Sequence, residues 1–99
     1  MVHYTEDRIS EEMLEKKAET LKTIAHPMRL QIINILMNGE LRVGDIVKRL
    51  GAKQSLTSQQ LSILKLHGVI KSRRNGHAIF YFLENKSIKN VMASILAEK

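Results

Sequence analysis

The sequence predicts a mainly α-helical chain with one small β-hairpin, arranged as a winged helix-turn-helix. Two short amphipathic helical patterns are separated by a glycine, a basic hairpin pattern follows them at once, two further helical segments precede this group and one follows it. Together these patterns predict about five helices and a two-stranded wing. At 99 residues the chain is expected to form one domain over residues 1–99, and its core is small enough that a partner subunit would stabilise it.

The first two helices are predicted on either side of a proline. Ser10 followed by two glutamates is an N-cap signal, so the first helix is expected over residues 11–25. Pro27 disfavours helical geometry in His26 but is well suited to begin the next helix. That second helix is apolar on most sides up to Asn38-Gly39, and we expect it to be the central element of the core.

The helix-turn-helix is predicted over residues 43–65. Its first helix has the i, i+3, i+4, i+7 apolar spacing of a short amphipathic helix, and Gly51 offers the left-handed residue that ends it. The second helix gathers its leucines and isoleucine on one side, while serine and glutamine crowd the other. Serine inside a helix lowers helix propensity, so this uncharged polar face indicates a partner other than water.

A wing is predicted over residues 69–83. Two β-prone runs flank Asn75-Gly76, which is a strong hairpin signal because both central residues of that turn need a positive φ. Four side chains are expected to crowd the hairpin tip: Lys71, Arg73, Arg74 and His77. The last helix is predicted over residues 87–97, with Asn85 or Ser87 at its start.

Both end helices carry apolar stripes that a chain of this length has little core to cover. The sequence therefore predicts a homodimer whose interface is formed by the helices over residues 11–25 and 87–97. The candidate interface residues are Leu14, Ala18, Leu21, Val91, Met92 and Ile95.

Basic charge is concentrated in the middle of the chain. The formal net charge is +6, and residues 42–77 hold eight Lys and Arg against one acid, whereas residues 1–40 hold five against seven. Such segregation within one domain favours a polyanionic partner. The major groove of B-DNA admits one α-helix, and its base edges are read by side chains that donate and accept hydrogen bonds. The serines and glutamines are expected against bases and the basic groups, with Lys48 and Arg49, against phosphates. The candidate DNA-binding residues are Lys53, Gln54, Ser55, Ser58, Gln59, Ser62, Lys65, Arg73, Arg74 and His77.

Three short motifs occur in order along the chain. They are Ala25, Pro27 and Arg29, then Gln54, Ser55, Ser58, Gln60 and Leu61, then Gly76 and Tyr81. In their order and spacing they resemble the ArsR/SmtB family of bacterial winged-helix repressors, over nearly the whole chain. The resemblance implies a homodimer that binds an inverted-repeat operator and releases it when an inducer is sensed.

The usual metal sites of that family have no counterpart in this sequence. The positions that match its thiolate ligands are Arg42, Gly44 and Val47, and Asn85 and Ser87 stand where ligands of the last helix would be. The chain has no cysteine, which excludes disulfides and thiolate sites. The four histidines, His3, His26, His67 and His77, lack the i, i+3 or i, i+4 spacing of a helical metal site. We therefore expect no metal, no cofactor, and an inducer other than a metal at the usual sites.

The leading prediction is a dimeric, sequence-specific DNA-binding transcriptional regulator, and within that class a repressor. A cytoplasmic location without a membrane partner is expected, because no apolar run approaches the ~18 residues of a span and the N-terminus lacks a signal-peptide core. Two alternatives stay open: a winged-helix module that binds RNA or protein, and an anti-repressor that displaces another regulator. An enzyme is not predicted, since no nucleophile with its base is recognisable. Asp45, the one acid in the basic region, is expected to cap locally or to pair with Arg49.

Overall fold

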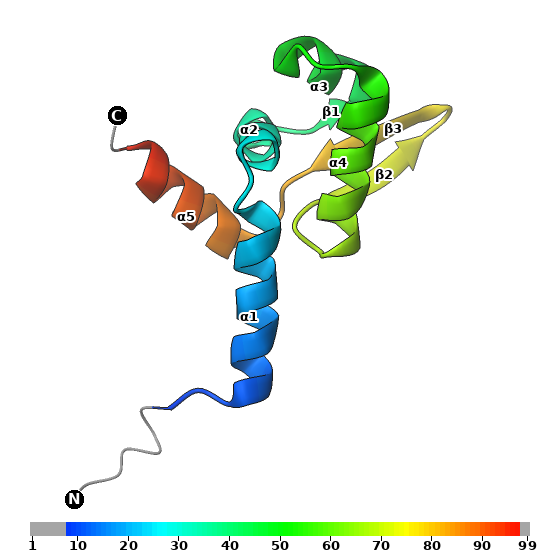
Figure 1. Ribbon diagram of the computed structural model, residues 1–99. Coiled ribbons are helices and arrows are strands. Elements are labelled where there is room, and N and C mark those ends of the chain that lie inside the picture. Colours follow the sequence, from blue (N-terminus) through cyan, green and yellow to red (C-terminus); the bar gives the residue numbers. More distant parts are fainter. Residues whose placement is uncertain (1–7, 98–99) are drawn as a thin grey trace, which may run out of the picture.

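Residues 8–97, the part of the chain that the computed structural model describes, form five helices and three short strands (Figure 1). In chain order these are α1 (Glu11–Ile24), α2 (Pro27–Leu36), β1 (Leu41–Arg42), α3 (Val43–Leu50), α4 (Gln54–Leu66), β2 (Lys71–Asn75), β3 (Ala78–Phe82) and α5 (Lys86–Leu96). The helix pair α3 and α4 is followed directly by the hairpin of β2 and β3, which confirms the winged helix-turn-helix. Within residues 8–97 no helix is both long and apolar enough to cross a membrane.

The helix ends follow the capping signals in the sequence. The Ser10 hydroxyl accepts a hydrogen bond from the Met13 backbone N–H at 3.2 Å, and Pro27 is the first residue of α2. Gly51 ends α3 with a left-handed φ of 70°, a conformation that costs glycine little because it has no Cβ. Asn85, rather than Ser87, caps α5, because its side-chain oxygen accepts from the Ile88 backbone N–H at 3.0 Å.

The core is built around α2, as its apolar composition predicts. Its buried residues Ile32, Ile33 and Leu36 belong to one cluster with residues from α3, α4, the segment after α4, and α5. Those partners are Ile46, Leu61, Leu64, Val69, Ile70, Ile88 and Met92, and the cluster also holds Ile24 of α1 and Leu83, which follows β3. Helix α4 therefore sits on the same packed core as the end of the wing and the last helix, so its outer face is held in a defined direction.

The sheet has a strand that the sequence pattern does not reveal. The strand order is β1-β3-β2, with β3 antiparallel to both neighbours. Leu41 lies opposite Tyr81 and Arg42 opposite Phe80. The two-stranded wing itself is present as β2 and β3. Strand β1 has only two residues, too few for an alternation of apolar and polar side chains to be visible, so the sequence did not predict the third strand of the sheet.

The turn of the wing lies one residue later than predicted. Asn75 and Ala78 are paired strand residues, so the two-residue loop is Gly76-His77. Gly76 has a φ of 66°, and among residues 8–97 no residue other than glycine has a positive φ. Glycine at the first loop position is the requirement of a type II′ turn. The expectation that Asn75 and Gly76 are both central turn residues was therefore wrong.

Helix α1 projects away from the rest of the chain, and α5 leaves the body in a different direction (Figure 1). All residues from Glu11 to Glu19 are exposed, and the buried residues of α1 are Thr23 and Ile24 in its last turn. A 14-residue helix without packing along most of its length is at the limit of stability in water. Most of α1 therefore lacks a packing partner among residues 8–97.

Candidate nucleic-acid interface

The polar face of α4 is exposed, because the opposite face of the helix packs on the core. The buried residues of α4 are Thr57, Gln60, Leu61 and Leu64. The predicted reading residues point away from them: Ser58 is half-buried, and Gln54, Ser55, Gln59, Ser62 and Lys65 are exposed. Hydroxyl and amide groups in this position are free to bond to a ligand that lies along the helix.

The exposure of three α4 residues differs from what the helical pattern in the sequence suggests. Leu56, expected on the apolar side, is 41% exposed and lies at the edge of the polar face. Thr57 and Gln60 are buried although they are polar, and both are satisfied: the Thr57 hydroxyl donates to the Lys53 carbonyl at 2.9 Å, and Gln60 accepts from Arg29 at 2.8 Å. A helical wheel groups residues by angle, but it does not show which polar side chain has a buried partner.

Basic side chains surround the polar face of α4. Lys53 precedes the helix and Lys65 lies in its last turn, while Lys48 and Arg49 are exposed at the end of α3. Arg74 and His77 are exposed at the outer end of the wing. Positive charge on both sides of an uncharged hydrogen-bonding face fits a duplex, whose phosphates flank its base edges.

Arg73 lies over the sheet rather than at the tip of the wing. Its Nε donates to Glu40 Oε2 at 2.9 Å, and its Nη2 donates to Glu40 Oε1. Its guanidinium carbon is 4.7 Å from the centroid of the Phe80 ring, within the range of a cation–π contact. The hydrogen bond to Arg73 lowers the pKa of Glu40 from its ordinary 4.5. Much of the charge of Arg73 is therefore offset within the protein.

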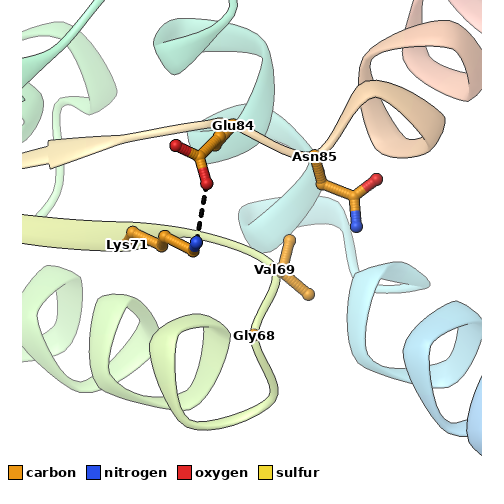
Figure 2. Close-up of a pocket in the computed structure, with 5 residues that line it drawn as sticks. All are labelled: Gly68, Val69, Lys71, Glu84 and Asn85. Carbon is orange, nitrogen blue, oxygen red and sulfur yellow. Dashed lines mark hydrogen bonds and ion pairs between the residues drawn. The ribbon is translucent and has the colours of Figure 1, made fainter.

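Lys71 is also separated from the tip. Its ammonium nitrogen is 2.6 Å from Glu84 Oε1, and the pair spans the inner ends of β2 and the segment after β3 (Figure 2). The hydrogen bond and charge of Lys71 lower the pKa of Glu84. Together with the Glu40 pair, this leaves Arg74 and His77 as the groups at the outer end of the wing.

A hollow of about 410 Å³ separates the start of α3 from the wing. Arg42, Gly44 and His77 are among the residues that line it. Arg42 and Gly44 are two of the positions that the resemblance places at thiolate ligands, and neither carries a metal-binding side chain. Asp45 pairs locally, as expected, but its partner is Arg42 rather than Arg49. Its carboxylate is 3.8 Å from Arg42 Nε.

The histidines do not come together in the described part of the chain. Within residues 8–97 no group of three or more His, Asp or Glu side chains is placed to hold a metal ion. His67 and His77 are exposed, and His26 is the N-cap residue of α2. His3 lies outside the described residues.

The predicted interface residues separate into two groups. Leu14, Ala18, Leu21 and Ile95 are exposed and Val91 is half-buried, so they are available to a partner. Met92 is only 2% exposed and belongs to the core of its own chain, so its assignment to a surface that meets a partner was wrong. Ile95 lies on the same stripe of α5 nearly one turn further on, where it is 51% exposed.

Two contacts escaped sequence reasoning because each joins segments far apart in the chain. Glu40 reaches Arg73 across 33 positions and Arg29 reaches Gln60 across 31. The approach of Glu40 depends on β1, which no periodicity reveals. Arg29 and Gln60 were each recognised in a motif, but nothing in the sequence joined them.

Comparison with known proteins agrees with this arrangement. Residues 26–72 match the family of bacterial regulatory proteins named the arsR family. A biofilm growth-associated repressor of Xylella fastidiosa (strain 9a5c) is 39% identical over 83 residues, which cover 80% of this chain and 73% of the relative. The transcriptional repressor PagR of Bacillus anthracis is 38% identical over 94 residues, 93% of each chain, and its crystal structure has a TM-score of 0.81 over 87% of this chain and 99% of that one.

A third likeness concerns assembly as well as fold. The solution structure of Mb0332 from Mycobacterium bovis is described as a homodimeric winged helix-turn-helix DNA-binding domain. It has a TM-score of 0.80 and 27% identity, and the match covers 90% of this chain and 85% of that one. The relatives are named as regulators of transcription, and the fold is that of a winged helix-turn-helix DNA-binding domain. This chain therefore belongs to the arsR family of bacterial DNA-binding transcriptional regulators.

Proposed function

We propose that two copies of this protein bind an inverted-repeat operator, with one α4 in the major groove of each half-site. The observation that carries the proposal is the exposed uncharged face of α4, set between basic groups. Gln59 and Ser62 are exposed at its centre, and glutamine and serine are side chains that bond to base edges in the major groove. Lysine and glutamate would keep such a face soluble at less cost to helix propensity, so serine and glutamine in their place indicate a partner other than water.

The basic groups supply affinity without reading bases. Lys53, Lys65, Lys48 and Arg49 are placed to meet phosphates beside α4, and Arg74 and His77 to meet the backbone or minor groove near the wing. Release of counterions from the duplex makes such contacts favourable and strongly salt-dependent. Because the partner is chromosomal DNA, the place of action we propose is the cytoplasm.

The dimer is proposed from α1 and α5. Leu14, Leu21 and Ile95 are exposed by 47%, 55% and 51%, and every residue of α1 from Glu11 to Glu19 is exposed in the described part of the chain. A second copy would cover these stripes and place two recognition helices on one side of the dimer, as an inverted repeat requires. The homodimeric description of Mb0332 supports this assembly.

We propose repression as the mode of regulation, because the Xylella fastidiosa relative and PagR, both named as repressors, are 39% and 38% identical to this chain. Occupation of an operator that overlaps a promoter excludes the polymerase. A module that acts only on RNA or protein would not need a helix face that matches the major groove. The deep major groove of A-form RNA is too narrow for side chains to read.

The test is selection of duplexes from a random-sequence pool by the purified protein. The expected product is an inverted repeat with half-sites about 10 base pairs, one helical turn, apart. The selected duplex placed over a reporter promoter should lower expression when the protein is present. Failure to enrich any sequence, or equal competition by an RNA duplex of the same sequence, would contradict sequence-specific DNA binding, and raised expression would contradict repression alone.

Removal of the acid that pairs with Arg73 should strengthen binding to any duplex. Glu40→Gln leaves the charge of Arg73 unpaired, so we expect tighter binding to random DNA and a salt slope steeper by about 0.9 if one phosphate contact is gained. Because Arg73 lowers the pKa of Glu40, the wild-type carboxylate stays ionised down to pH values below 4.5, and its effect on DNA binding should not vary between pH 6 and pH 8.

The measurement is a salt titration of binding to random duplex by both proteins. Glu84→Gln is the matched control. It also removes the acidic partner of a basic side chain of the wing, but that side chain is Lys71, at the inner end of β2. Equal changes in the two variants would mean that only net charge matters and that Arg73 does not approach a phosphate.

Metal ions should not release the protein from its selected duplex. Arg42 and Gly44 offer no metal ligand at the positions that match the thiolate site of the family. At the site on the last helix, the side-chain oxygen of Asn85 is already used to cap α5. Zinc, cobalt, arsenite and the thiol oxidant diamide should each leave the affinity unchanged within about threefold, or roughly 0.65 kcal/mol. A reproducible tenfold release by one of the metals would mean that histidines of two subunits, His3 included, form a site.

A further inference from the structure

Arg29 lies where three helices meet. It belongs to α2 and is half-buried. Its Nη1 donates to the backbone carbonyl of Thr23 at 3.1 Å, at the end of α1, and its Nε donates to Gln60 Oε1 at 2.8 Å, in the middle of α4. One guanidinium therefore connects the projecting helix with the recognition helix.

The bond to Thr23 follows from the proline that begins α2. In a continuous helix the carbonyl of Thr23 would accept from the N–H four residues later, but that residue is Pro27, which has no N–H. Thr23 is buried, and a buried carbonyl without a donor is costly. Arg29 supplies the donor, and its positive charge lies at the negative end of the α1 dipole.

The bond to Gln60 fixes the back of the recognition helix. Gln60 is 8% exposed and lies on the face of α4 opposite to the proposed reading face, directly after Gln59 in the chain. The guanidinium is planar and holds its Nε and Nη1 donors in a fixed relation. The two acceptors, one on α1 and one on α4, are therefore held by donors of the same planar group.

We propose that Arg29 is a positioning residue that couples the direction of α1 to the placement of α4 on DNA. This inference rests on the proposed function, since α1 is part of the proposed dimer interface and α4 reads the operator. Through Arg29, the geometry of the dimer sets the spacing and tilt of the two reading helices. Loss of the bridge should lower discrimination between operator and random duplex more than it lowers stability or dimer formation.

The experiment compares three single variants in α4. Gln60→Leu removes the acceptor and should reduce the affinity ratio of selected to scrambled duplex by about fivefold or more, within the range known for residues that couple sites. Gln60→Glu keeps an acceptor for Arg29 and should retain the ratio. Thr57→Val is the matched control, because Thr57 is buried on the same face and its hydroxyl bonds only within its own helix. If Gln60→Leu does not fold, Arg29→Lys replaces it, since an ammonium cannot hold both acceptors in the same geometry.

A second readout follows the helix directions without DNA. The chain has no cysteine, so cysteines introduced at Lys22 and Leu66 can carry spin labels at one end of α1 and of α4, in labelled chains diluted with unlabelled ones. The distance distribution should broaden in Gln60→Leu and stay narrow in Thr57→Val and Gln60→Glu.

The result that overturns the coupling is an unchanged ratio and an unchanged distance distribution in Gln60→Leu, or a loss in Gln60→Glu as large as that in Gln60→Leu. Either outcome, obtained while the wild type still prefers its selected duplex, would reject the role of Arg29 and leave the proposed function in place. A wild type without any preference would instead reject the proposed function.

Discussion

Leu21→Glu should convert the dimer into a monomer that has lost tight operator binding. Leu21 is 55% exposed on the stripe of α1 that we assign to the partner. Burial of a leucine contributes about 1.5–3 kcal/mol, and twofold symmetry applies the loss in both copies. A carboxylate at an apolar interface adds a desolvation cost. The dimer should therefore dissociate about a hundredfold more readily or worse, as measured by sedimentation equilibrium, and operator affinity should fall with it.

Lys22→Gln is the control for the change in charge. It alters the net charge by the same amount one position along α1, and Lys22 is exposed, so the variant should remain a dimer. Ile95→Glu tests the other half of the proposed interface and should behave like Leu21→Glu. A wild-type protein that sediments as a stable monomer at micromolar concentration would contradict the proposed dimer, and an intact dimer in both glutamate variants would place the interface elsewhere.

Gln59→Ala should lower preference for the operator without much change in binding to random DNA. A bidentate contact to a base contributes about 1–3 kcal/mol of discrimination, which corresponds to roughly a 5- to 150-fold change. Ser58→Ala should act in the same direction, provided that its half-buried hydroxyl reaches a base. Lys65→Ala should instead weaken binding to both duplexes and reduce the salt slope by about one, because a phosphate contact carries no sequence information.

The measurement is a titration of the selected and the scrambled duplex at several salt concentrations. Gln31→Ala is the control, because it makes the same substitution at an exposed position of α2, outside the proposed DNA interface. If Gln59→Ala and Ser58→Ala both keep the wild-type preference, the exposed polar face of α4 is not the surface that reads the operator.

Local signals in the sequence were sufficient for most of the fold. Each predicted helix boundary rests on a residue whose chemistry acts within a few positions: Ser10 and Asn85 as caps, Pro27 as a first residue, Gly51 as a left-handed end. The structure places each within one residue of its predicted end. The apolar composition likewise identified α2 as the core helix, and its residues Ile32, Ile33 and Leu36 are buried.

What the sequence did not reveal depends on contacts between distant segments. Strand β1 exists because β3 lies beside it, so the pairing of Glu40 with Arg73 was not predictable from the neighbours of either residue. Met92 and Ile95 share one apolar stripe, and only the packed structure shows that the first faces the core of its own chain. The turn at Gly76-His77 differs from the predicted one by a single position. The register between β2 and β3 selects between these two turns, and that register depends on pairing along the whole hairpin.

The unsupported length of α1 has a consequence for how this protein responds to its own concentration. If nine exposed residues, Glu11 to Glu19, become well-ordered helix only against a second copy, then folding of that segment and association are one equilibrium, and stability follows mass action. Dilution would then remove helical content as well as the partner, so the far-ultraviolet circular dichroism per residue and the melting temperature should both fall together as protein is diluted through the dissociation constant. In a cell, protein below the dissociation constant would be monomeric, with a frayed α1 that proteases can cut. The concentration at which the chain becomes resistant to proteolysis would then be the concentration at which it dimerises and can occupy an operator.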